Sequence, residues 1–336
     1  MKATIYDVAR EAGVSISTVS KALNNSYTIS GETTIHIKEI AERLNYRPNA
    51  RAQTLARQMN KDVTLLTPSY HNMAFINPHM VEAMIGAENA LSTKGYALKL
   101  QGCNRENVYD FASIIIDSKN TDGLMIHGAL VTRELAILIT SREIPHIILG
   151  SPNFRNSLCW IDINNRYAGE IAANHLVETG RRKIAFIGGT DDDNVSKERF
   201  EGVKNKLKDQ ELVFDEEMIL KGTSTAEDGS RMAGELINRG MPDSIVCANN
   251  VLAFGCMRFL QASNIRIPDD ISIITFDDYP LAQLTIPMLT TVSIDVYDMG
   301  WQAAKLIIDK IKKPQMLIQT YATMPRLVIR GSTMKT

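Results

Sequence analysis

The sequence contains little cysteine, and the cysteines it has form no pattern. Its four cysteines in 336 residues make no C-x-x-C pair and no cysteine–histidine spacing of the kind that binds zinc. The six histidines make no H-x-x-x-H pair. We therefore expect no metal site, and we expect the thiols to be reduced and mostly buried. The four residues are Cys103, Cys159, Cys247 and Cys256.

Long apolar runs and catalytic motifs are also missing. No apolar run reaches the length of a membrane span and no signal peptide opens the chain, so we expect a cytoplasmic protein without membrane contact. Nothing matches a nucleophile elbow, and no Lys-Ser/Thr pair follows Gly188–Thr190 as it would in a phosphate-binding loop. The acidic run Asp191–Asp193 lacks calcium-loop spacing. We expect no catalytic residue and no cofactor, which disfavours an enzyme.

The chain as a whole lacks an excess of charge of either sign. Its net charge is −1, and its 44% apolar residues can build sizeable cores in two to three domains. The charge is unevenly distributed, because residues 1–61 carry a net charge of +4 and the remainder carries −5. A basic head on an acidic body is typical of a protein whose amino-terminal segment binds DNA. Ordinary scatter of charge among so few residues is the alternative.

The first helices of the chain can be read from their caps. Thr4 followed by Asp7 is a capping-box variant that predicts a helix beginning at Ile5. Gly13 can adopt the left-handed conformation that turns the chain, and Ser15 can cap a second helix. The pattern predicts a helix-turn-helix, a unit that lays its second helix in the DNA major groove. A solvated helix hairpin in an unrelated helical cap is the alternative.

The second helix presents side chains that suit DNA. Ile16 can contact a thymine methyl group, Ser17 can bond to either base type, and Lys21 can reach a guanine edge or a phosphate. Ser20 and Thr18 can donate hydroxyl hydrogen bonds to phosphate oxygens. The residues of this head that we expect to contact DNA are Thr4, Ser15, Ile16, Ser17, Thr18, Ser20, Lys21 and Asn24.

Two amino-terminal stretches read TIYDVAREAGVSISTVSKALNN and YRPNARAQTLAR. Later stretches read INPHMVEAMIGAE, TDGLMIHG, GRRKIAFIGG, ERFEGVKNKL, VCANNVLAFG, IPDDISIITFDD and PMLTTVSID. Together they resemble the LacI/GalR family of bacterial repressors, in the family's order and over essentially the whole chain. The resemblance implies a sequence-specific DNA-binding transcriptional regulator, most often a repressor. It also implies a homodimer, or a tetramer made of two dimers, on a pseudo-palindromic operator.

A short helix is expected after the helix-turn-helix, at residues 49–57. The resemblance implies that it is the hinge helix, which orders on operator DNA and pairs with its dimer mate in the minor groove. Leu55 matches the leucine that wedges a base step open there, a use that suits an apolar side chain. A plain interdomain linker is the alternative, because so short a helix is marginal alone in water. The residues expected to contact DNA here are Asn49, Ala52, Leu55 and Ala56.

From residue 63 onward, strand-like apolar runs alternate with amphipathic helical stretches, which predicts parallel sheets covered on both faces. The expected strands are Val63–Thr67, Ala97–Leu100, Gly123–His127, His146–Gly150, Lys183–Gly188, Ser244–Ala248 and Ser272–Phe276. These are too many units for one core, so we expect two doubly wound lobes that divide at about residue 161. The resemblance implies the same arrangement, the type-I periplasmic-binding-protein fold with three crossing segments. We expect Leu289–Asp295 and the helix Tyr297–Ile311 to cross back to the first lobe.

The expected fold is therefore an all-α helix-turn-helix head plus an α/β body of two parallel-sheet lobes. The expected domains are a helix-turn-helix DNA-binding domain at 1–47, a hinge helix and linker at 48–60, an effector-binding N-lobe at 61–161 and 290–322, and an effector-binding C-lobe at 162–289 and 323–336.

Ligands of open α/β sheets bind beyond the carboxyl ends of the strands, so the ligand is expected between the lobes. Asp277 ends a strand, and the resemblance implies that it accepts hydrogen bonds from sugar hydroxyls or a purine. Arg199 matches an arginine that commonly reaches the effector, and Asn249 offers both a donor and an acceptor. Tyr70, His127, His79 and Met80 complete the expected effector-binding set. His79 and Met80 stand where the family usually shows two aromatics, which puts aromatic stacking in doubt.

Each of these residues has an alternative interpretation. Asp277 can cap the next helix or turn, Arg199 can pair with an acid on its own helix, and Asn249 can cap the helix that begins at Asn250. His79 can be structural. Before the next helix this chain reads Ile163-Asn164, where the family often has Asp-Asn, so a polar contact at the lobe crossover is expected to be missing.

The expected effector is a small molecule, a sugar or sugar derivative, that changes the angle between the lobes and so shifts a population of conformations. Whether it releases DNA or promotes DNA binding is left open by the sequence. One alternative is a regulator of the same fold controlled by a protein partner, a phosphorylated carrier protein, as in the catabolite-control branch of the family. The other is an enzyme on a doubly wound fold, which the absence of a catalytic constellation disfavours.

Overall fold

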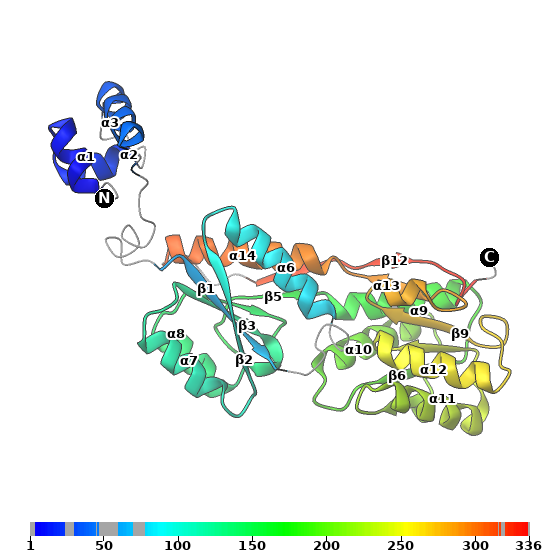
Figure 1. Ribbon diagram of the computed structural model, residues 1–336. Helices are drawn as coiled ribbons and strands as arrows, with labels where there is room; N and C mark the ends of the chain where they lie inside the picture. Colours follow the sequence, from blue (N-terminus) through cyan, green and yellow to red (C-terminus); the bar gives the residue numbers. More distant parts are fainter. Residues whose placement is uncertain are drawn as a thin grey trace. The chain divides into compact units, whose positions relative to one another are not determined.

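The computed structural model describes residues 4–23, 30–44, 46, 60–69, 78–314, 316 and 320–334 (Figure 1). The chain forms two compact units, a head at Met1–Lys61 and a body at Asp62–Thr336. Among the described residues, no helix combines the length and the apolar character that crossing a membrane requires.

The described part of the head contains α1 (Ile5–Ala12), α2 (Ile16–Leu23) and α3 (Gly31–Arg43). The helix α1 begins where the capping pattern predicts, because the Asp7 carboxylate accepts hydrogen bonds from the backbone N–H and the hydroxyl of Thr4 at 2.9 and 2.7 Å. Gly13 ends it with φ of +64°, the left-handed conformation that glycine adopts without strain. The hydroxyl of Ser15 then accepts from the N–H of Thr18 at 3.1 Å and caps α2.

The three helices share a small core of their own. Val8, Val19, Ala22 and Ile37 are completely buried, and Ile40 is nearly so. Complete burial of one valine or isoleucine side chain stabilises a fold by about 1.5–3 kcal/mol. The head therefore holds its helices together without apolar residues from the body.

Six parallel strands form the first sheet of the body, in the order β11-β5-β4-β3-β1-β2. The strands are β1 (Asp62–Pro68), β2 (Ala97–Cys103), β3 (Gly123–His127), β4 (His146–Leu149), β5 (Trp160–Ile163) and β11 (Thr320–Thr323). The helices beside this sheet are α6 (Pro78–Ser92), α7 (Val108–Asp117), α8 (Arg133–Ser141) and α14 (Val296–Lys312), with the short helix η1 (Gly128–Leu130). The pair α7 and α8 covers one face of the sheet, and α6 and α14 cover the other (Figure 1). This is a doubly wound lobe, as expected.

The second sheet has the order β12-β10-β9-β8-β6-β7, and only its edge strand β12 runs antiparallel to its neighbour among the described strands. The strands are β6 (Ile184–Gly188), β7 (Ile219–Lys221), β8 (Ser244–Cys247), β9 (Ser272–Phe276), β10 (Thr290–Ser293) and β12 (Arg326–Val328). The helices are α9 (Asn165–Glu178), α10 (Asn194–Asp209), α11 (Ala226–Gly240), α12 (Asn250–Ala262), α13 (Pro280–Gln283) and the short helix η2 (Glu216–Met218). Helices α9 and α10 pack together, as do α11 and α12.

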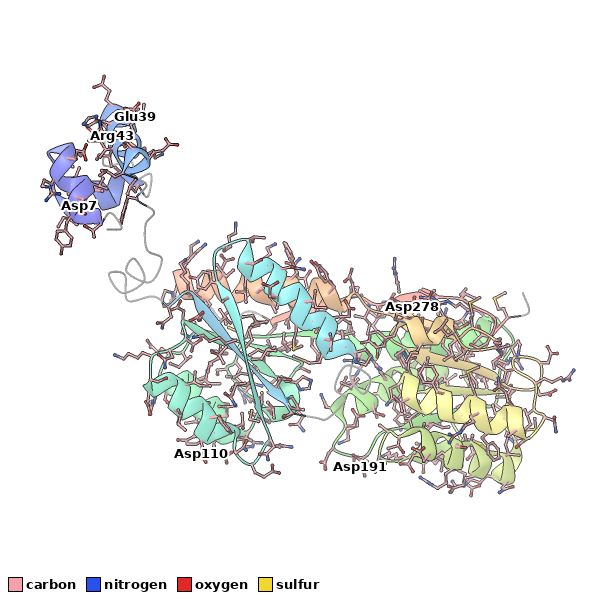
Figure 2. All side chains as sticks on the ribbon, viewed as in Figure 1. Asp7, Glu39, Arg43, Asp110, Asp191 and Asp278 are labelled. Atoms are coloured by element: carbon pink, nitrogen blue, oxygen red, sulfur yellow. The ribbon has the colours of Figure 1, made fainter. Side chains whose placement is uncertain are left out.

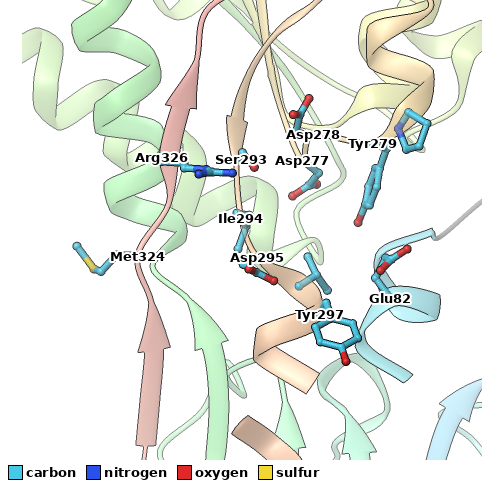
Figure 3. Close-up of a pocket in the computed structure, with 12 residues that line it drawn as sticks. Glu82, Asp277, Asp278, Tyr279, Ser293, Ile294, Asp295, Tyr297, Met324 and Arg326 are labelled. Carbon is cyan, nitrogen blue, oxygen red and sulfur yellow. The ribbon is translucent and has the colours of Figure 1, made fainter. Parts of the chain in front are cut away.

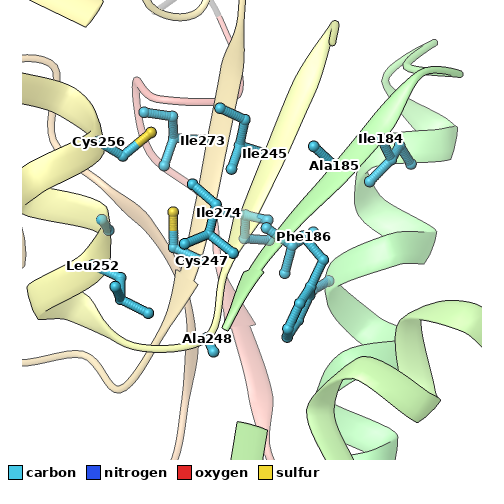
Figure 4. Close-up of a cluster of buried hydrophobic side chains, with 14 of the residues drawn as sticks. Ile184, Ala185, Phe186, Ile245, Cys247, Ala248, Leu252, Cys256, Ile273 and Ile274 are labelled. Atoms are coloured by element: carbon cyan, nitrogen blue, oxygen red, sulfur yellow. The ribbon is translucent and has the colours of Figure 1, made fainter. Parts of the chain in front are cut away.

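The core of this second lobe lies under its central strands. Figure 4 shows Phe186, Ile245 and Ile274 side by side with Cys247 and Cys256, and all of them are buried. The four cysteines of the chain are free thiols in buried positions, as expected from their spacing. Burial and the neighbouring Cys256 raise the pKa of Cys247, so its thiol is protonated and behaves as an apolar core group.

The course of Leu289–Asp295 differs from the expectation. Residues 290–293 form β10, which pairs with β9 in the second sheet, so this stretch crosses to the first lobe only after the strand. The reason is burial, because all four residues of the strand are buried between β9 and β12 of the second sheet. The expected N-lobe range 290–322 thus begins inside a strand of the other sheet, and the expected division at 161 falls inside β5. The chain passes between lobes at three places, after β5, β10 and β11.

Candidate functional site

The described surface of the head includes the outer face of α2. Ile16 exposes 39% of its surface there, whereas Val19 and Ala22 on the other face are buried. The hydroxyls of Ser15 and Thr18 lie 2.8 Å apart, so both side chains stay at the amino-terminal end of the helix. An exposed isoleucine beside two hydroxyls gives this helix end an apolar and a polar contact group.

Several expected DNA contacts cannot be placed. Ser17, Ser20 and Lys21 belong to α2, but their side chains are not among those that the structure describes. The other five lie outside the described residues: Asn24, Asn49, Ala52, Leu55 and Ala56.

Two ion pairs lie on the described surface of the head. Asp7 bonds to Arg10 at 2.8 Å and Glu11 bonds to Arg43 at 2.5 Å, and Figure 2 shows Asp7 and Arg43 at the surface of the head. The hydroxyl and the N–H of Thr4 hold the pKa of Asp7 below its usual value. Exposed pairs of this kind add little stability, so the cap and the core position α2.

In the body, Arg199 is the centre of the candidate site. It rises from α10 with 2% of its surface exposed, and its guanidinium lies 4.4 Å from the ring of Phe276. Its Nε donates to Oδ1 of Asn165 at 3.0 Å, Nη1 to the carbonyl of Ala248 at 2.7 Å, and Nη2 to Oδ1 of Asp277 at 3.3 Å. A buried arginine bonded at all three nitrogens fixes its partners rather than offering a free positive charge.

Arg199 does not make the expected alternative pair with an acid on its own helix. Glu198 instead pairs with Arg166 at 3.1 Å, at the exposed side of α10. The expectation that a polar contact is missing before α9 is also wrong. Asn165, next to the Ile163-Asn164 pair, holds Arg199 and donates to the carbonyl of Ile163 at 3.3 Å.

Asp277 follows β9 in an unusual backbone conformation. Its φ is +69°, in the left-handed region that residues other than glycine rarely adopt, and such strain recurs at functional sites. Its N–H donates to the carbonyl of Val292, and its own carbonyl accepts from Nδ2 of Asn250 at 2.7 Å. The helix α13 is capped at Tyr279, so Asp277 is not the helix cap of the alternative interpretation. Its carboxylate instead accepts a hydrogen bond from Arg199.

His79 reaches this carboxylate from the other lobe. It lies in the first turn of α6, with Nδ1 3.8 Å from Oδ1 of Asp277 and its ring edge-on to Tyr279 at 6.5 Å. Burial lowers the pKa of His79, opposed by the charge of Asp277 and reinforced by that of Arg199. A neutral imidazole therefore meets the aspartate across the lobes, at a distance longer than a hydrogen bond.

The other expected residues fill lesser positions. His127 caps η1 by accepting from the N–H of Ala129 at 3.2 Å, and burial, with His79 nearby, lowers its pKa to about 4. Met80 is buried in α6. Asn249 caps α12 by accepting from the N–H of Leu252 at 2.9 Å, which is its alternative interpretation. Tyr70 lies outside the described residues.

A cavity of about 410 Å³ opens beside Asp277, at the crossing between the lobes (Figure 3). It is lined by Glu82, Asp277, Asp278, Tyr279, Pro280, Ser293, Ile294, Asp295, Val296, Tyr297, Met324 and Arg326. Its volume lies within the range of about 300–1,000 Å³ that small-ligand pockets occupy. The hydroxyl of Tyr279 is buried and has no hydrogen-bond partner among the described residues. The cavity is thus a ligand-sized space with polar groups directed into it.

Most residues of this site, including Glu82, Asp295 and Arg326 in the cavity wall, were not expected from the sequence. Asn165 and Asn250 hold Arg199 and the backbone of Asp277, and Tyr279 lines the cavity. The sequence offered a pointer to Asn165, because it lies one residue after the position where the family often has Asp-Asn. Tyr279 lies two residues after Asp277, which was expected. Among the described residues, no group of three or more His, Cys, Asp or Glu could hold a metal ion.

A helix-turn-helix head followed by two α/β lobes with a cavity at their crossing defines a class, the ligand-responsive DNA-binding regulators. Comparison with known families agrees. The family profile described as "Bacterial regulatory proteins, lacI family" matches residues 4–49, and that of the "Periplasmic binding protein-like domain" matches residues 173–333.

Relatives match over nearly the full length. The chain is 31% identical over 341 residues to the HTH-type transcriptional repressor PurR of Vibrio atlanticus, with 99% of each covered. It is 27% identical to Catabolite control protein A of Staphylococcus epidermidis, covering 99% of this chain and 100% of the relative. The chain belongs to the LacI family of bacterial regulatory proteins, and it is a DNA-binding transcriptional regulator.

Solved structures show the same architecture. A complex of the transcriptional regulator CelR with cellobiose matches with a TM-score of 0.75 and 26% identity, covering 98% of this chain and 99% of that one. The lac repressor dimer bound to operator and the anti-inducer ONPF matches with a TM-score of 0.79 over 99% of each chain, at 22% identity, which shows the shared fold. PurR and CelR are both named as regulators of transcription.

Proposed function

We propose that this regulator is a repressor that acts as a homodimer on a pseudo-palindromic operator and is controlled by a sugar or sugar derivative bound between its lobes. The observation that carries the proposal is the carboxylate of Asp277. Arg199 holds it at the wall of the cavity, within 3.8 Å of His79 from the other lobe. A ligand that bonds to this carboxylate alters the contact between Asp277 and His79, which joins the two lobes.

The control is a shift between lobe arrangements. A ligand can move that equilibrium only by its difference in affinity for the two arrangements. The contact of His79 with Asp277 and Tyr279 exists only while the lobes are close, so a ligand that replaces or bridges it has such a difference. The complex of CelR with cellobiose supports a small molecule as the effector.

DNA reading is assigned to the head. We propose that Ile16, Ser17 and Lys21 contact bases and that Thr4, Ser15, Thr18, Ser20 and Asn24 contact the backbone. The head presents Ile16 outward, in agreement with this assignment. We further propose that the hinge segment, with Asn49, Ala52, Leu55 and Ala56, enters the minor groove in pairs, which requires a dimer or a tetramer of two dimers. Such a protein works in the bacterial cytoplasm, where its DNA is.

Control by a phosphorylated carrier protein is the second candidate, and the relative named Catabolite control protein A favours it. The cavity favours the small molecule, because a protein partner needs no space of about 410 Å³ between the lobes. Addition of sugars to the purified full-length protein on its promoter DNA separates the two, since the partner is then absent.

The proposal predicts that Asp277→Asn weakens effector binding and leaves operator binding intact. Loss of one charge-assisted hydrogen bond costs about 1.5–3 kcal/mol, which is roughly a 10- to 150-fold loss of affinity. Calorimetry with the sugar that changes operator affinity measures the loss, and fluorescence anisotropy measures operator binding. The control is Asp110→Asn, on the surface of α7 (Figure 2). Unchanged sugar affinity in Asp277→Asn would remove the carboxylate from the effector site.

A further inference from the structure

The cavity at the lobe crossing has more acidic than basic groups in its wall. Glu82, Asp277, Asp278 and Asp295 line it, against the single arginine Arg326 among the described lining residues. Figure 3 shows the acids on several sides of the space, with Arg326 reaching in from β12. The balance depends on which of these charges are already neutralised.

Two of the acids are paired behind the wall. Arg330 holds Asp278 with two hydrogen bonds of 2.6 and 2.8 Å, which lowers the pKa of that carboxyl. Arg199 holds one oxygen of Asp277. Arg326 adds to the charge that acts on Asp278 and is partly balanced by it. Arg199 and Arg330 are therefore committed to carboxylates of the protein, whereas Arg326, exposed on β12, has no ion pair with a described residue.

The remaining groups of the wall accept hydrogen bonds or are neutral. Asp295 uses one oxygen to cap α14, at 2.8 Å from the N–H of Asp298, and its charge has no basic partner among the described residues. Glu82 is exposed on α6 and has no ion pair with a described residue. His79 adds no positive charge, because burial lowers its pKa. The hydroxyl of Tyr279 is a neutral group without a partner.

We propose that this cavity takes a carbohydrate that carries no anionic group and rejects the phosphorylated form of the same sugar. The inference rests on the proposed function, since it names the class of effector for that site. Carboxylates accept hydrogen bonds and donate none, so they suit the hydroxyl groups of a neutral sugar or the ammonium of an amino sugar. A phosphate brings a charge of about −1.5 to −2 toward Glu82 and Asp295, and these two unpaired acids outnumber the single arginine, Arg326, that could offset it. Each such repulsion costs on the order of tenfold in affinity.

The test compares matched pairs of sugars on the full-length protein. The probes are glucose and glucose 6-phosphate, ribose and ribose 5-phosphate, trehalose and trehalose 6-phosphate, with glucosamine as the cationic member. Thermal stabilisation and calorimetry at low ionic strength measure binding. In the pair that binds, the unphosphorylated sugar is expected to bind at least about tenfold tighter. Equal or tighter binding of the phosphorylated member overturns the proposal, and so does a panel in which nothing binds.

Operator affinity measured in the same samples separates this inference from the proposed function. If a sugar phosphate changes operator affinity, the proposed effector site is supported and the proposed selection against phosphorylated sugars is wrong. A neutral sugar that binds tightly without changing operator affinity keeps the charge selection and overturns the control of DNA binding.

The wall charge itself is tested by Glu82→Gln, with Glu88→Gln as the matched control. Both residues are exposed on α6, but only Glu82 lines the cavity. Glu82→Gln is expected to reduce the preference for the unphosphorylated sugar several-fold, and Glu88→Gln to leave it unchanged. The preference should also shrink at high salt, because Glu82 faces solvent. A preference that is identical in both variants and in the unaltered protein overturns the role of this wall.

Discussion

At the scale of single residues, the body is organised around one buried ion pair. Arg199 and Asp277 lie 78 positions apart in the chain and meet at the cavity, and Asn165 and Ala248 accept hydrogen bonds from the other two nitrogens of the arginine. Buried pairs of this kind often add little net stability, because desolvation offsets attraction. Their importance is positional, since loss of one partner leaves the other charge buried and unpaired.

This predicts that Arg199→Ala destabilises the body by about 3–5 kcal/mol, because Asp277 and the carbonyl of Ala248 then lose their buried partner. Urea denaturation followed by fluorescence measures the change. Arg166→Ala is the control, since its pair with Glu198 at 3.1 Å is partly exposed and worth less than about 1 kcal/mol. A similar loss in the free energy of unfolding in the two variants would show that the buried pair contributes no more to stability than the exposed pair.

His127 makes stability depend on pH. Its pKa is about 4 in the folded chain and about 6.5 when unfolded, so the unfolded chain takes up the proton first as the pH falls. Protonation of His127 therefore leaves the free energy of unfolding unchanged above about pH 6.5 and lowers it as the pH falls from 6.5 toward 4. Between pH 7.5 and pH 5 it removes about 2 kcal/mol from the free energy of unfolding. His127→Asn should lose that part of the pH dependence in denaturation curves, and equal slopes would contradict the assignment.

At the scale of elements, helix packing in the first lobe depends on close approach. The helices α6 and α14 cross so tightly that a Cβ on Gly300 would lie 2.0 Å from the carbonyl oxygen of Ala83. A Cβ on Gly86 would lie 2.1 Å from that of Tyr297. The crossing carries His79 at one end of α6, so its spacing helps to set the distance to Asp277.

Gly300→Ala is therefore expected to force the two helices apart and to destabilise the body by about 1–3 kcal/mol. It should also weaken the effector response, because α6 carries His79 and Glu82. Lys305→Ala, at an exposed position of the same helix, should change stability by less than about 0.5 kcal/mol. Differential scanning calorimetry compares the two. If Gly300→Ala is as stable as the control, the helices α6 and α14 can move apart without loss of stability, and the close approach is not required.

The elements show how far the sequence predicts the fold. The seven expected strands are present, because buried parallel strands are read as apolar runs. The short strands β5, β7, β11 and β12 are not among the expected strands, and the lobe expected for residues 290–293 of β10 is wrong. The sequence of residues 290–293 indicates a buried strand but does not indicate which of the two sheets the strand joins. At the site, Asp277 and Arg199 could be predicted from strand end and resemblance. Asn165, Asn250 and Tyr279 could not, because their contacts depend on tertiary packing.

At the scale of the whole molecule, the chain separates recognition of DNA from recognition of the effector. The apolar core of the head consists of residues from α1, α2 and α3 together with their flanks, and the cores of the body consist of residues from 63 onward. The lobes are joined at three crossings, and the cavity lies beside the second and third, so a ligand bound there as proposed would act on the segments that join the lobes. In the homodimer proposed above, coupling to DNA would depend on how the two bodies hold their heads.

Separate cores predict that a protein beginning at residue 60 keeps the stability of the body and its effector affinity. Its free energy of unfolding should lie within about 0.5 kcal/mol of the body transition in the full chain, because distant sites without shared partners act additively. Operator binding should vanish, since α2 is absent. Calorimetry measures the transition, and anisotropy with labelled promoter DNA measures binding. A body that loses several kcal/mol without its head, or that still selects its promoter over random duplex, would show that the two units are not the separate modules their cores indicate.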